Sequence, residues 1–247
     1  MTRLLLCAVV SLLFTSCASV GGPPASKFFL DPEVRRLAEA AASGDIAELN
    51  RLVGVGVNVN ALGRGRVTPL LWALLHQDKK GLAFLLAHGA DPNVQLTEDF
   101  DELLIEGVST MSYAARHKDP WYLKEVLSHG GNPNLVNPIR SQTPIMAALG
   151  SMRPENVRIL ISAGANLNWQ DRDGRTPMMD ATTANQYELI WAMLDAGADP
   201  KLKTRWGTTI VSGIKLIRTD PKSEQWKWRA KVIERLIAQG IDFEHER

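Results

Sequence analysis

Cysteine is almost absent from this sequence, which has only Cys7 and Cys17, both near the N-terminus. The rest of the chain therefore has no disulfide framework, no cysteine nucleophile and no thiolate ligand for a metal. Because no covalent cross-link supplements it, the stability of the folded part has to come from the packing of apolar side chains.

An excess of charge of one sign is lacking as well. The chain has 28 Lys and Arg against 27 Asp and Glu, which gives a net charge of +1. Removal of residues 1–16 would take away Arg3 as the only charged residue and leave the chain neutral. A nucleic-acid-binding protein requires a basic face, so we expect no nucleic-acid partner.

Signatures of catalysis and of metal binding are missing too. The sequence has no Gly-rich phosphate loop, and no Ser/His/Asp motif stands out, although a triad is recognised in space rather than in sequence. His76 and His117 recur at one offset, but stacked helices lie about 10 Å apart. A zinc site needs three or four ligands within about 2.3 Å of one point. We therefore expect no metal, no cofactor and no catalytic residue.

Long apolar runs are absent apart from residues 4–14, which are too few to span a bilayer comfortably. The run follows the basic Arg3 and precedes small residues, a pattern that predicts a secretion signal peptide in residues 1–16.

The end of this segment, residues 14–17, reads F-T-S-C and resembles a bacterial lipobox. The resemblance implies lipidation of Cys17, and Ala18 in place of Asp implies the outer membrane, with the domain facing the periplasm. Residues 17–30 then form the lipidated cysteine and a Gly/Pro-containing tether. The alternative is an ordinary signal peptide, cleaved near Ala18, and a soluble periplasmic product.

One repeated unit builds the main body of the chain and is complete in residues 164–197. Thr176 and Pro177 predict the start of a helix, because a Thr hydroxyl caps a free backbone N–H and Pro has no N–H to lose. A second helix with an apolar stripe at helical spacing follows and ends at Gly197. The stripe consists of Leu189, Ile190, Met193 and Leu194.

The same unit recurs along the chain. The glycines that end its second helices are Gly56, Gly89, Gly130, Gly164, Gly197 and Gly240. Their intervals are about 33, 41, 34, 33 and 43 residues, against a unit of about 33 residues. The pairs that open its first helices are Thr68-Pro69, Thr143-Pro144 and Thr176-Pro177, with weaker versions at Ser109-Thr110 and Thr209-Ile210.

These offsets together resemble an ankyrin-repeat array over residues 34–243. The resemblance implies an all-α solenoid of about six helix-turn-helix repeats with hairpin-like finger loops, in a domain of residues 31–247. It also implies that the protein is not an enzyme but binds a protein partner and is a monomer when free. The histidine of the family's T-P-L-H-x-A motif is replaced by Leu71, Ser112, Met146, Met179 and Ser212, which weakens the expected hydrogen bonds between repeats.

Two of the intervals are long, and insertions in such arrays go into loops. The first insertion, residues 95–107, is acidic and apolar, and it lies in the second finger loop. It is either a solvated loop whose apolar side packs back on the array, or an extended contact arm that includes Asp99, Phe100 and Asp101. The second, around residues 218–228, separates the helices of the last repeat, where Trp226 and Trp228 would extend and cap the final helix.

The family resemblance also implies where a partner binds, namely at the finger tips and at the exposed positions of the first helices. By matching offsets, the first-helix candidates are Trp72, Tyr113, Arg116 and Asp180. The finger candidates are Arg140, Arg172, Arg175, Arg205 and Trp206. Aromatic residues and Arg are enriched among interface anchors, and a row of arginines would suit an acidic protein surface. The alternatives are that Trp72 and Tyr113 fill gaps between helices and that the arginines are merely solvated.

The functional hypothesis is a protein-binding module in the bacterial envelope. Bacterial lipoproteins of this shape resemble immunity proteins, so the partner would be a toxic effector enzyme that acts in the periplasm, such as a type VI secretion phospholipase. The alternative is a scaffold or accessory factor for a resident periplasmic enzyme, for example in oxidative-stress defence.

Overall fold

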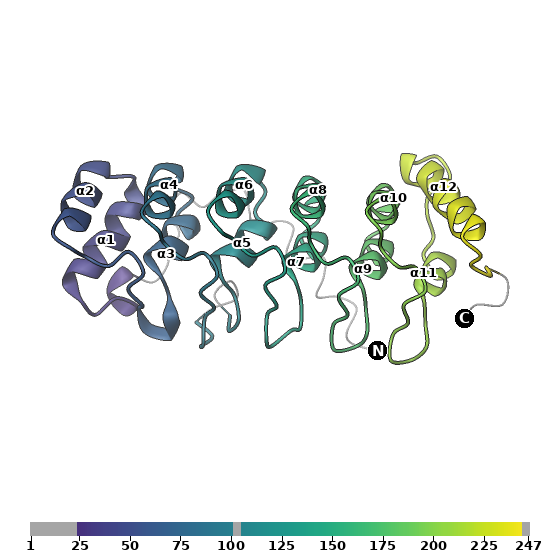
Figure 1. Cartoon of the computed structure of the whole chain (residues 1–247), viewed down its shortest axis with the longest axis horizontal. Coiled ribbons are helices and arrows are strands. Elements are labelled where there is room, and N and C mark those ends of the chain that lie inside the picture. Colours follow the sequence, from purple (N-terminus) through teal and green to yellow (C-terminus); the bar gives the residue numbers. More distant parts are fainter. Residues whose placement is uncertain (1–23, 101–104, 244–247) are drawn as a thin grey trace.

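The computed structural model describes residues 24–100 and 105–243, and in these residues it shows a solenoid of twelve α-helices in six pairs (Figure 1). The pairs are α1 (Pro32–Ser43) with α2 (Ile46–Gly54), α3 (Pro69–Leu75) with α4 (Lys79–Ala87), α5 (Thr110–Arg116) with α6 (Pro120–Ser128), α7 (Pro144–Gly150) with α8 (Pro154–Ser162), α9 (Pro177–Thr183) with α10 (Tyr187–Asp195), and α11 (Ile210–Leu216) with α12 (Glu224–Ala238). Short 3-10 helices precede α1 (Ala25–Lys27) and α3 (Arg64–Arg66). The predicted all-α repeat solenoid is confirmed.

The predicted signal peptide and Cys17 lie outside the described residues. Within the part of the chain that the structure describes, no helix is both long enough and apolar enough to cross a bilayer.

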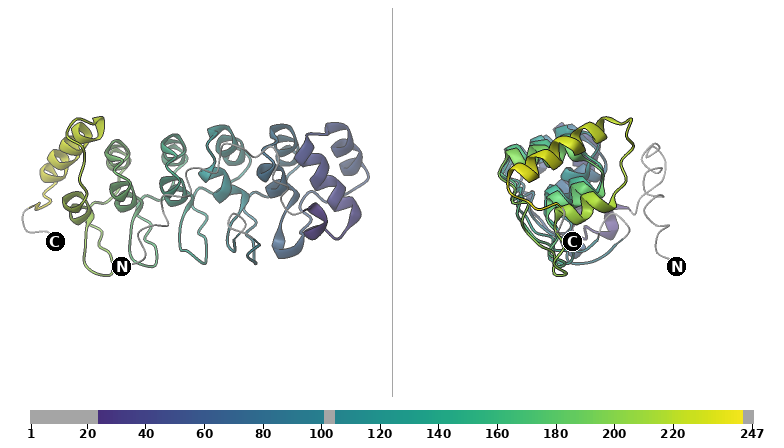
Figure 2. Two further views of the ribbon diagram at one scale, coloured as in Figure 1. Left: turned by 180° about the vertical axis from the view of Figure 1, so that it is seen from behind. Right: turned by 90° about the vertical axis from the view of Figure 1, so that its right-hand side faces the viewer.

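The helices form two layers, and five finger loops extend from one side of them (Figures 1 and 2). The first helix of each repeat lies nearer the fingers and the second lies farther away (Figure 1). The core between the layers consists of small and aliphatic side chains, such as Ala41, Leu74 and Leu149. The fingers are residues 57–67, 91–108, 132–142, 166–175 and 199–208.

The first helices begin as the cap pattern predicts. Thr68 Oγ1 accepts a hydrogen bond from Leu71 N at 3.1 Å, and Thr176 Oγ1 accepts one from Met179 N at 3.4 Å. Thr143 has the same extended backbone but makes no such bond, and its buried hydroxyl has no partner. At this third Thr-Pro pair, the proline and the extended threonine start the helix without the side-chain cap.

A ladder of asparagines joins consecutive repeats along the edge of the array. Asn93 Nδ2 donates to Gly130 O at 2.9 Å, and Asn93 Oδ1 accepts from Asn132 N at 2.8 Å. The other members are Asn60, Asn134 and Asn168, each bonded to the following repeat. Lys201 stands at the equivalent position of the fifth repeat, so the asparagine ladder ends there.

The folded domain begins earlier than predicted. Phe28 and Phe29, assigned by the sequence to the tether of residues 17–30, are only 2% and 1% exposed. Their rings lie 5.4 and 6.1 Å from the ring of Trp72, measured between centroids. The segment is also fastened through its backbone, since Arg64 N donates to Phe28 O at 2.7 Å. Residues 25–29 are therefore part of the packed array, not of a flexible tether.

The second finger contains the first insertion, and its apolar side packs back on the array. Phe100 lies edge-on to Phe28, with ring centroids 4.9 Å apart, and Ile105 packs in the same cluster. Leu96 N donates to Val108 O at 2.8 Å, and Gly107 N donates to Leu96 O at 2.8 Å, which gives the base of the finger a hairpin form. Of the two readings of the insertion, the structure favours the loop that packs back.

The last repeat differs from the others. Its second helix, α12, begins after the cap residue Ser223 and includes Trp226 and Trp228 in its first turns, so the insertion extends this helix as predicted. α12 packs against α10 much more than against its own partner α11. Arg229 Nη2 bridges to Ile214 O of α11 at 3.0 Å, but the buried Nε of Arg229 has no partner.

Candidate binding surface

Trp72 does not lie on the exposed surface. Its side chain is only 5% exposed, because Phe28 and Phe29 cover it. The prediction that Trp72 is an exposed anchor is therefore wrong, and the alternative reading, in which it fills a gap, describes it better. The position of Trp72 in its repeat does not reveal that a segment more than forty residues earlier in the chain covers its side chain.

The first helices of the repeats form one side of the array, which we call the inner face (Figure 1). Tyr113 and Arg116 are half-buried there, one turn apart on α5. Among residues 24–100 and 105–243, no carboxylate forms an ion pair with Arg116. Burial lowers the pKa of the Arg116 guanidinium, and the positive charge of Arg140 lowers it further, against the opposing effect of Tyr113. Arg116 stays charged because a guanidinium keeps its proton in proteins. The pair Arg116 and Arg140 thus presents positive charge that the described part of the protein does not neutralise.

The tips of the last three fingers carry exposed side chains, which together we call the finger ridge. It consists of Ile139, Arg140, Arg172, Arg205 and Trp206. Trp206 is 62% exposed and Ile139 is 43% exposed, values that are high for large apolar side chains. Sequence reasoning missed Ile139, although its place between Pro138 and Arg140 in a predicted finger was a usable signal.

Hydrogen bonds hold the fingers of the ridge against one another. Arg172 Nη2 reaches back to Pro138 O of the third finger at 2.8 Å. Gln170 Nε2 donates to Lys203 O of the fifth finger at 2.8 Å, and Arg205 N donates to Asp173 O of the fourth at 3.0 Å. The ridge is therefore ordered before any partner arrives, which reduces the entropy lost on binding.

Arg205 and Trp206 form the end of the ridge as one unit. The guanidinium of Arg205 lies over the Trp206 ring, 4.3 Å from its centroid, and Arg205 Nη2 lies 2.9 Å from Asp173 Oδ1. Both ion-pair partners are largely exposed, so the pair adds little stability. Its effect is to orient the exposed indole.

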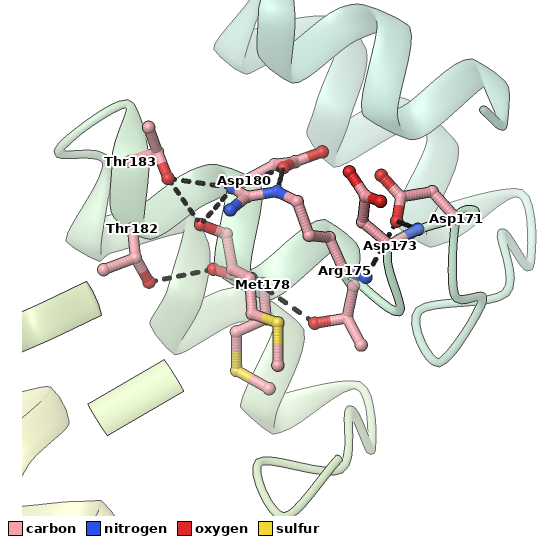
Figure 3. A network of polar contacts seen from close by, with 9 residues as sticks. Asp171, Asp173, Arg175, Met178, Asp180, Thr182 and Thr183 are labelled. Atoms are coloured by element: carbon pink, nitrogen blue, oxygen red, sulfur yellow. Dashed lines mark hydrogen bonds and ion pairs between the residues drawn. The ribbon is translucent and has the colours of Figure 1, made fainter. Parts of the chain in front are cut away.

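Arg175 was predicted as a finger-tip residue, but its side chain points toward α9 instead (Figure 3). Its Nε and Nη2 both donate to Asp180 Oδ1, at 2.9 and 2.8 Å, and Nη2 also donates to Thr183 Oγ1 at 2.9 Å. Burial raises the pKa of Asp180, and the bonds from Arg175 oppose that rise. Asp180 is thus a support for Arg175 rather than a free acidic contact.

The acidic finger gives a mixed result. Asp99 is exposed, but its carboxylate accepts a hydrogen bond from Glu106 N at 2.7 Å and so closes the loop. Phe100 is half-buried against Phe28, with Arg64 stacked 5.5 Å from its ring centroid. Asp101 lies outside the described residues. Arg116 thus lies close enough to Arg140 of the finger ridge for the two charges to interact. Phe100 is used for packing instead.

The histidines do not form a metal site with nearby ligands. In residues 24–100 and 105–243, no three His, Cys, Asp or Glu side chains converge as metal ligands would. His117 has a structural role instead, since its Nδ1 accepts a hydrogen bond from Asp119 N at 3.0 Å and its ring contacts Tyr122 edge-on at 4.4 Å.

The stability of the protein is expected to fall as the pH drops through the titration of His117. Burial lowers the pKa of His117 below its ordinary value of 6.5, and the nearby Lys118 and Arg153 add to this, while the backbone carbonyl oxygen of Asp119, 3.3 Å from Nδ1, and the charge of Asp119 oppose it. The unfolded chain then takes up a proton first, so the contribution is complete above about pH 6.5 and is lost toward the folded pKa.

The measurement is the urea midpoint at about pH 7.5 and about pH 5.5 for the wild type and for His117→Asn, whose amide oxygen can still accept from Asp119 N. The wild type should lose more stability between these pH values than the variant. An equal loss in both proteins would show that His117 is not the group responsible.

Comparisons with known proteins agree with this geometry. Residues 111–204 match the family described as ankyrin repeats, with three copies. The chain is 28% identical to the human mitochondrial disaggregase over 238 residues, or 93% of this chain and 31% of that protein. It is 32% identical to the protein PhlB of Serratia liquefaciens over 150 residues, or 61% of this chain and 62% of PhlB. The chain thus spans less than two thirds of the length of either relative.

Two solved structures share the fold at 20% sequence identity. One is a chain in the complex of a predatory endopeptidase of Bdellovibrio bacteriovorus with an immunity protein, with a TM-score of 0.61 over 81% of this chain and 97% of that one. The other is the ankyrin-repeat protein EF0377, with a TM-score of 0.65 over 83% of this chain and 99% of that one.

The six stacked pairs with their finger loops define a repeat solenoid. The three repeats within residues 111–204 match the ankyrin-repeat model, and the solved structures show that the whole array shares this fold.

Proposed function

We propose that this protein is a non-catalytic inhibitor of the immunity type, which binds a toxic enzyme through the finger ridge and the inner face of repeats three to six. The observation that carries the proposal is the ridge itself. It combines an exposed Trp206 with Arg140 and Arg172 on fingers that hydrogen bonds fix in place. Tight inhibition requires such a preordered surface, because a mobile one would lose binding energy to ordering.

The charges on this surface indicate the chemistry of the partner. Arg116 and Arg140 have no carboxylate partners among the described residues, and Arg172 donates its hydrogen bond to a neutral carbonyl. An acidic patch on the partner would neutralise them, which favours fast, oriented association. Trp206 and Ile139 would supply the apolar contact area.

The comparisons support the inhibitor class within this proposal. One solved structure with the same fold comes from a complex of a bacterial endopeptidase with an immunity protein, and at 20% identity this likeness concerns the fold. We further propose that Cys17 is lipidated and places the domain at the periplasmic side of the outer membrane, where it meets an effector such as a type VI secretion phospholipase.

Trp206→Ala is expected to weaken the complex by about 2 kcal/mol or more, which corresponds to a Kd about thirty times higher. The bait is the Cys17→Ser form, used to capture binding proteins from envelope and secreted fractions. The Kd of the captured enzyme and the loss of its activity are then measured against the wild type and Trp206→Ala.

The matched control is Trp226→Ala, because Trp226 is also a partly exposed tryptophan but lies on α12, away from the ridge. Capture of a toxic hydrolase that the wild type inhibits and Trp206→Ala inhibits poorly would support the proposal. Capture of a housekeeping enzyme whose activity is unchanged would overturn it in favour of a scaffold. Equal Kd values for Trp206→Ala and the wild type would overturn the choice of the ridge.

A further inference from the structure

A cavity of about 200 Å³ opens on the inner face between α9, α11 and the fifth finger. Its wall is formed by apolar groups from Met179, Ile210 and Leu216, and by the side chains of several threonines. Arg175 lies in the lining as the one charged residue. The cavity adjoins the network of Arg175, Asp180 and Thr183 (Figure 3).

Gly213 in the last repeat is part of the cavity wall, at a point where two first helices approach closely. Matching offsets in the first helices give Trp72, Tyr113, Ala147, Asp180 and Gly213. A Cβ at Gly213 would lie 2.9 Å from Thr182 Cγ2, so α9 and α11 approach too closely for a larger residue. Equivalent positions in earlier repeats carry side chains, whereas the close approach of α9 and α11 requires glycine here.

The volume fits one side chain better than a free small molecule. Ligand pockets usually measure roughly 300–1,000 Å³. An apolar cavity of about 150 Å³, by contrast, is large enough to hold benzene. A cavity of about 200 Å³ therefore accommodates one aromatic ring with a small substituent.

The polar part of the lining indicates what that substituent is. Arg175 Nε and Nη2 donate hydrogen bonds to Asp180, Thr183 and the carbonyl oxygen of Met179. In the described residues its Nη1 donates no hydrogen bond, so this nitrogen remains available to an acceptor. Asp180 and Thr183 hold the guanidinium in place. An aromatic ring that carries a hydroxyl oxygen satisfies both the apolar wall and this donor.

We propose that this cavity receives a tyrosine side chain of the protein partner. The inference rests on the proposed function, because it assumes that the partner covers the inner face beside the finger ridge. The fifth finger connects the two surfaces, since Thr204 and Thr208 line the cavity while Trp206 stands at the tip between them. A partner that contacts Trp206 therefore lies next to the cavity opening.

The first test uses p-cresol, which has the ring and hydroxyl of a tyrosine side chain, and needs no partner. Titration of the Cys17→Ser protein should shift the methyl NMR signal of Met179 saturably, and toluene, which lacks the hydroxyl, should bind at least about threefold more weakly. Leu216→Ala should weaken p-cresol binding, and its folding should be unaffected because Leu216 is 80% exposed. Trp226→Ala should bind p-cresol as the wild type does.

Thr183→Trp, at the exposed edge of the cavity, should abolish the shift by filling the space. If this variant does not fold, Leu216→Ala still decides the test. No saturable shift of Met179, or equal binding of p-cresol and toluene, would overturn the assignment to tyrosine.

The second test separates this inference from the proposed function. With the captured enzyme, Leu216→Ala should raise the Kd, and tyrosine-to-alanine replacement in the enzyme should remove the difference between Leu216→Ala and the wild type. If p-cresol binds but no inhibited enzyme is found, the proposed function falls while the cavity site stands. If the enzyme is inhibited equally by the wild type and Leu216→Ala, the cavity assignment falls alone.

Discussion

Phe29→Ala is expected to lower the free energy of unfolding by about 3–5 kcal/mol, the usual loss for a fully buried phenylalanine. Phe29 is 1% exposed and packs edge-on against Trp72, and the backbone at Gly63 approaches its ring so closely that a Cβ there would lie 2.9 Å from Cδ1. The truncation would leave a cavity between the N-terminal segment and α3. It would also expose part of Trp72.

Leu30→Ala is the matched control, because Leu30 is the next residue in the chain but is 86% exposed. It should change the stability by no more than about 0.5 kcal/mol. Urea denaturation followed by tryptophan fluorescence measures both variants. If Phe29→Ala and Leu30→Ala unfold at the same urea concentration as the wild type, residues 25–29 are a tether after all.

Gly81→Ala is expected to disrupt the contact between the first two repeats. A Cβ at residue 81, in α4, would lie 1.9 Å from the carbonyl oxygen of Ala41 in α1. Both groups belong to helix backbones, so no side-chain rotation relieves the clash, and the helices have to separate. The free energy of unfolding is expected to fall by at least about 1–3 kcal/mol, the usual cost of an overpacked core.

Gly54→Ala makes the same substitution in a neighbouring helix, where nothing lies within 4 Å of the added methyl group. This variant should be as stable as the wild type, or more stable by about 0.4–1 kcal/mol, because alanine restricts the unfolded chain. Thermal or urea unfolding of the pair isolates the effect of helix approach. Equal stability of Gly81→Ala and Gly54→Ala would contradict the packing of α4 on α1.

Local features of the fold were predictable because neighbouring residues determine them. Thr68 and Thr176 cap helices by accepting from the backbone N–H three residues later, and Gly197 lies past the end of α10 with a φ of +89°. The repeat length then fixed the stacking order, since a single helix pair cannot bury its apolar face alone.

The features that were missed depend on side-chain contacts that the spacing of residues in the sequence does not reveal. Phe29 covers Trp72, so a residue at an outward offset became part of the core. Arg175 left the fourth finger tip because Asp180 and Thr183, one helix later, bind its guanidinium. The cavity beside Gly213 is lined by residues of α9, α11 and the fifth finger, which no sequence pattern brings together.

The asparagine ladder that stops at Lys201 gives the array two unequal ends. The first repeat is fastened by the Phe28 and Phe29 segment, whereas the last has no ladder asparagine before it and a second helix that packs mainly on α10. We therefore expect local unfolding to begin at the C-terminal end, where it costs the least free energy. The cavity lies at that junction, so a partner bound there would stabilise the C-terminal end of the array against unfolding.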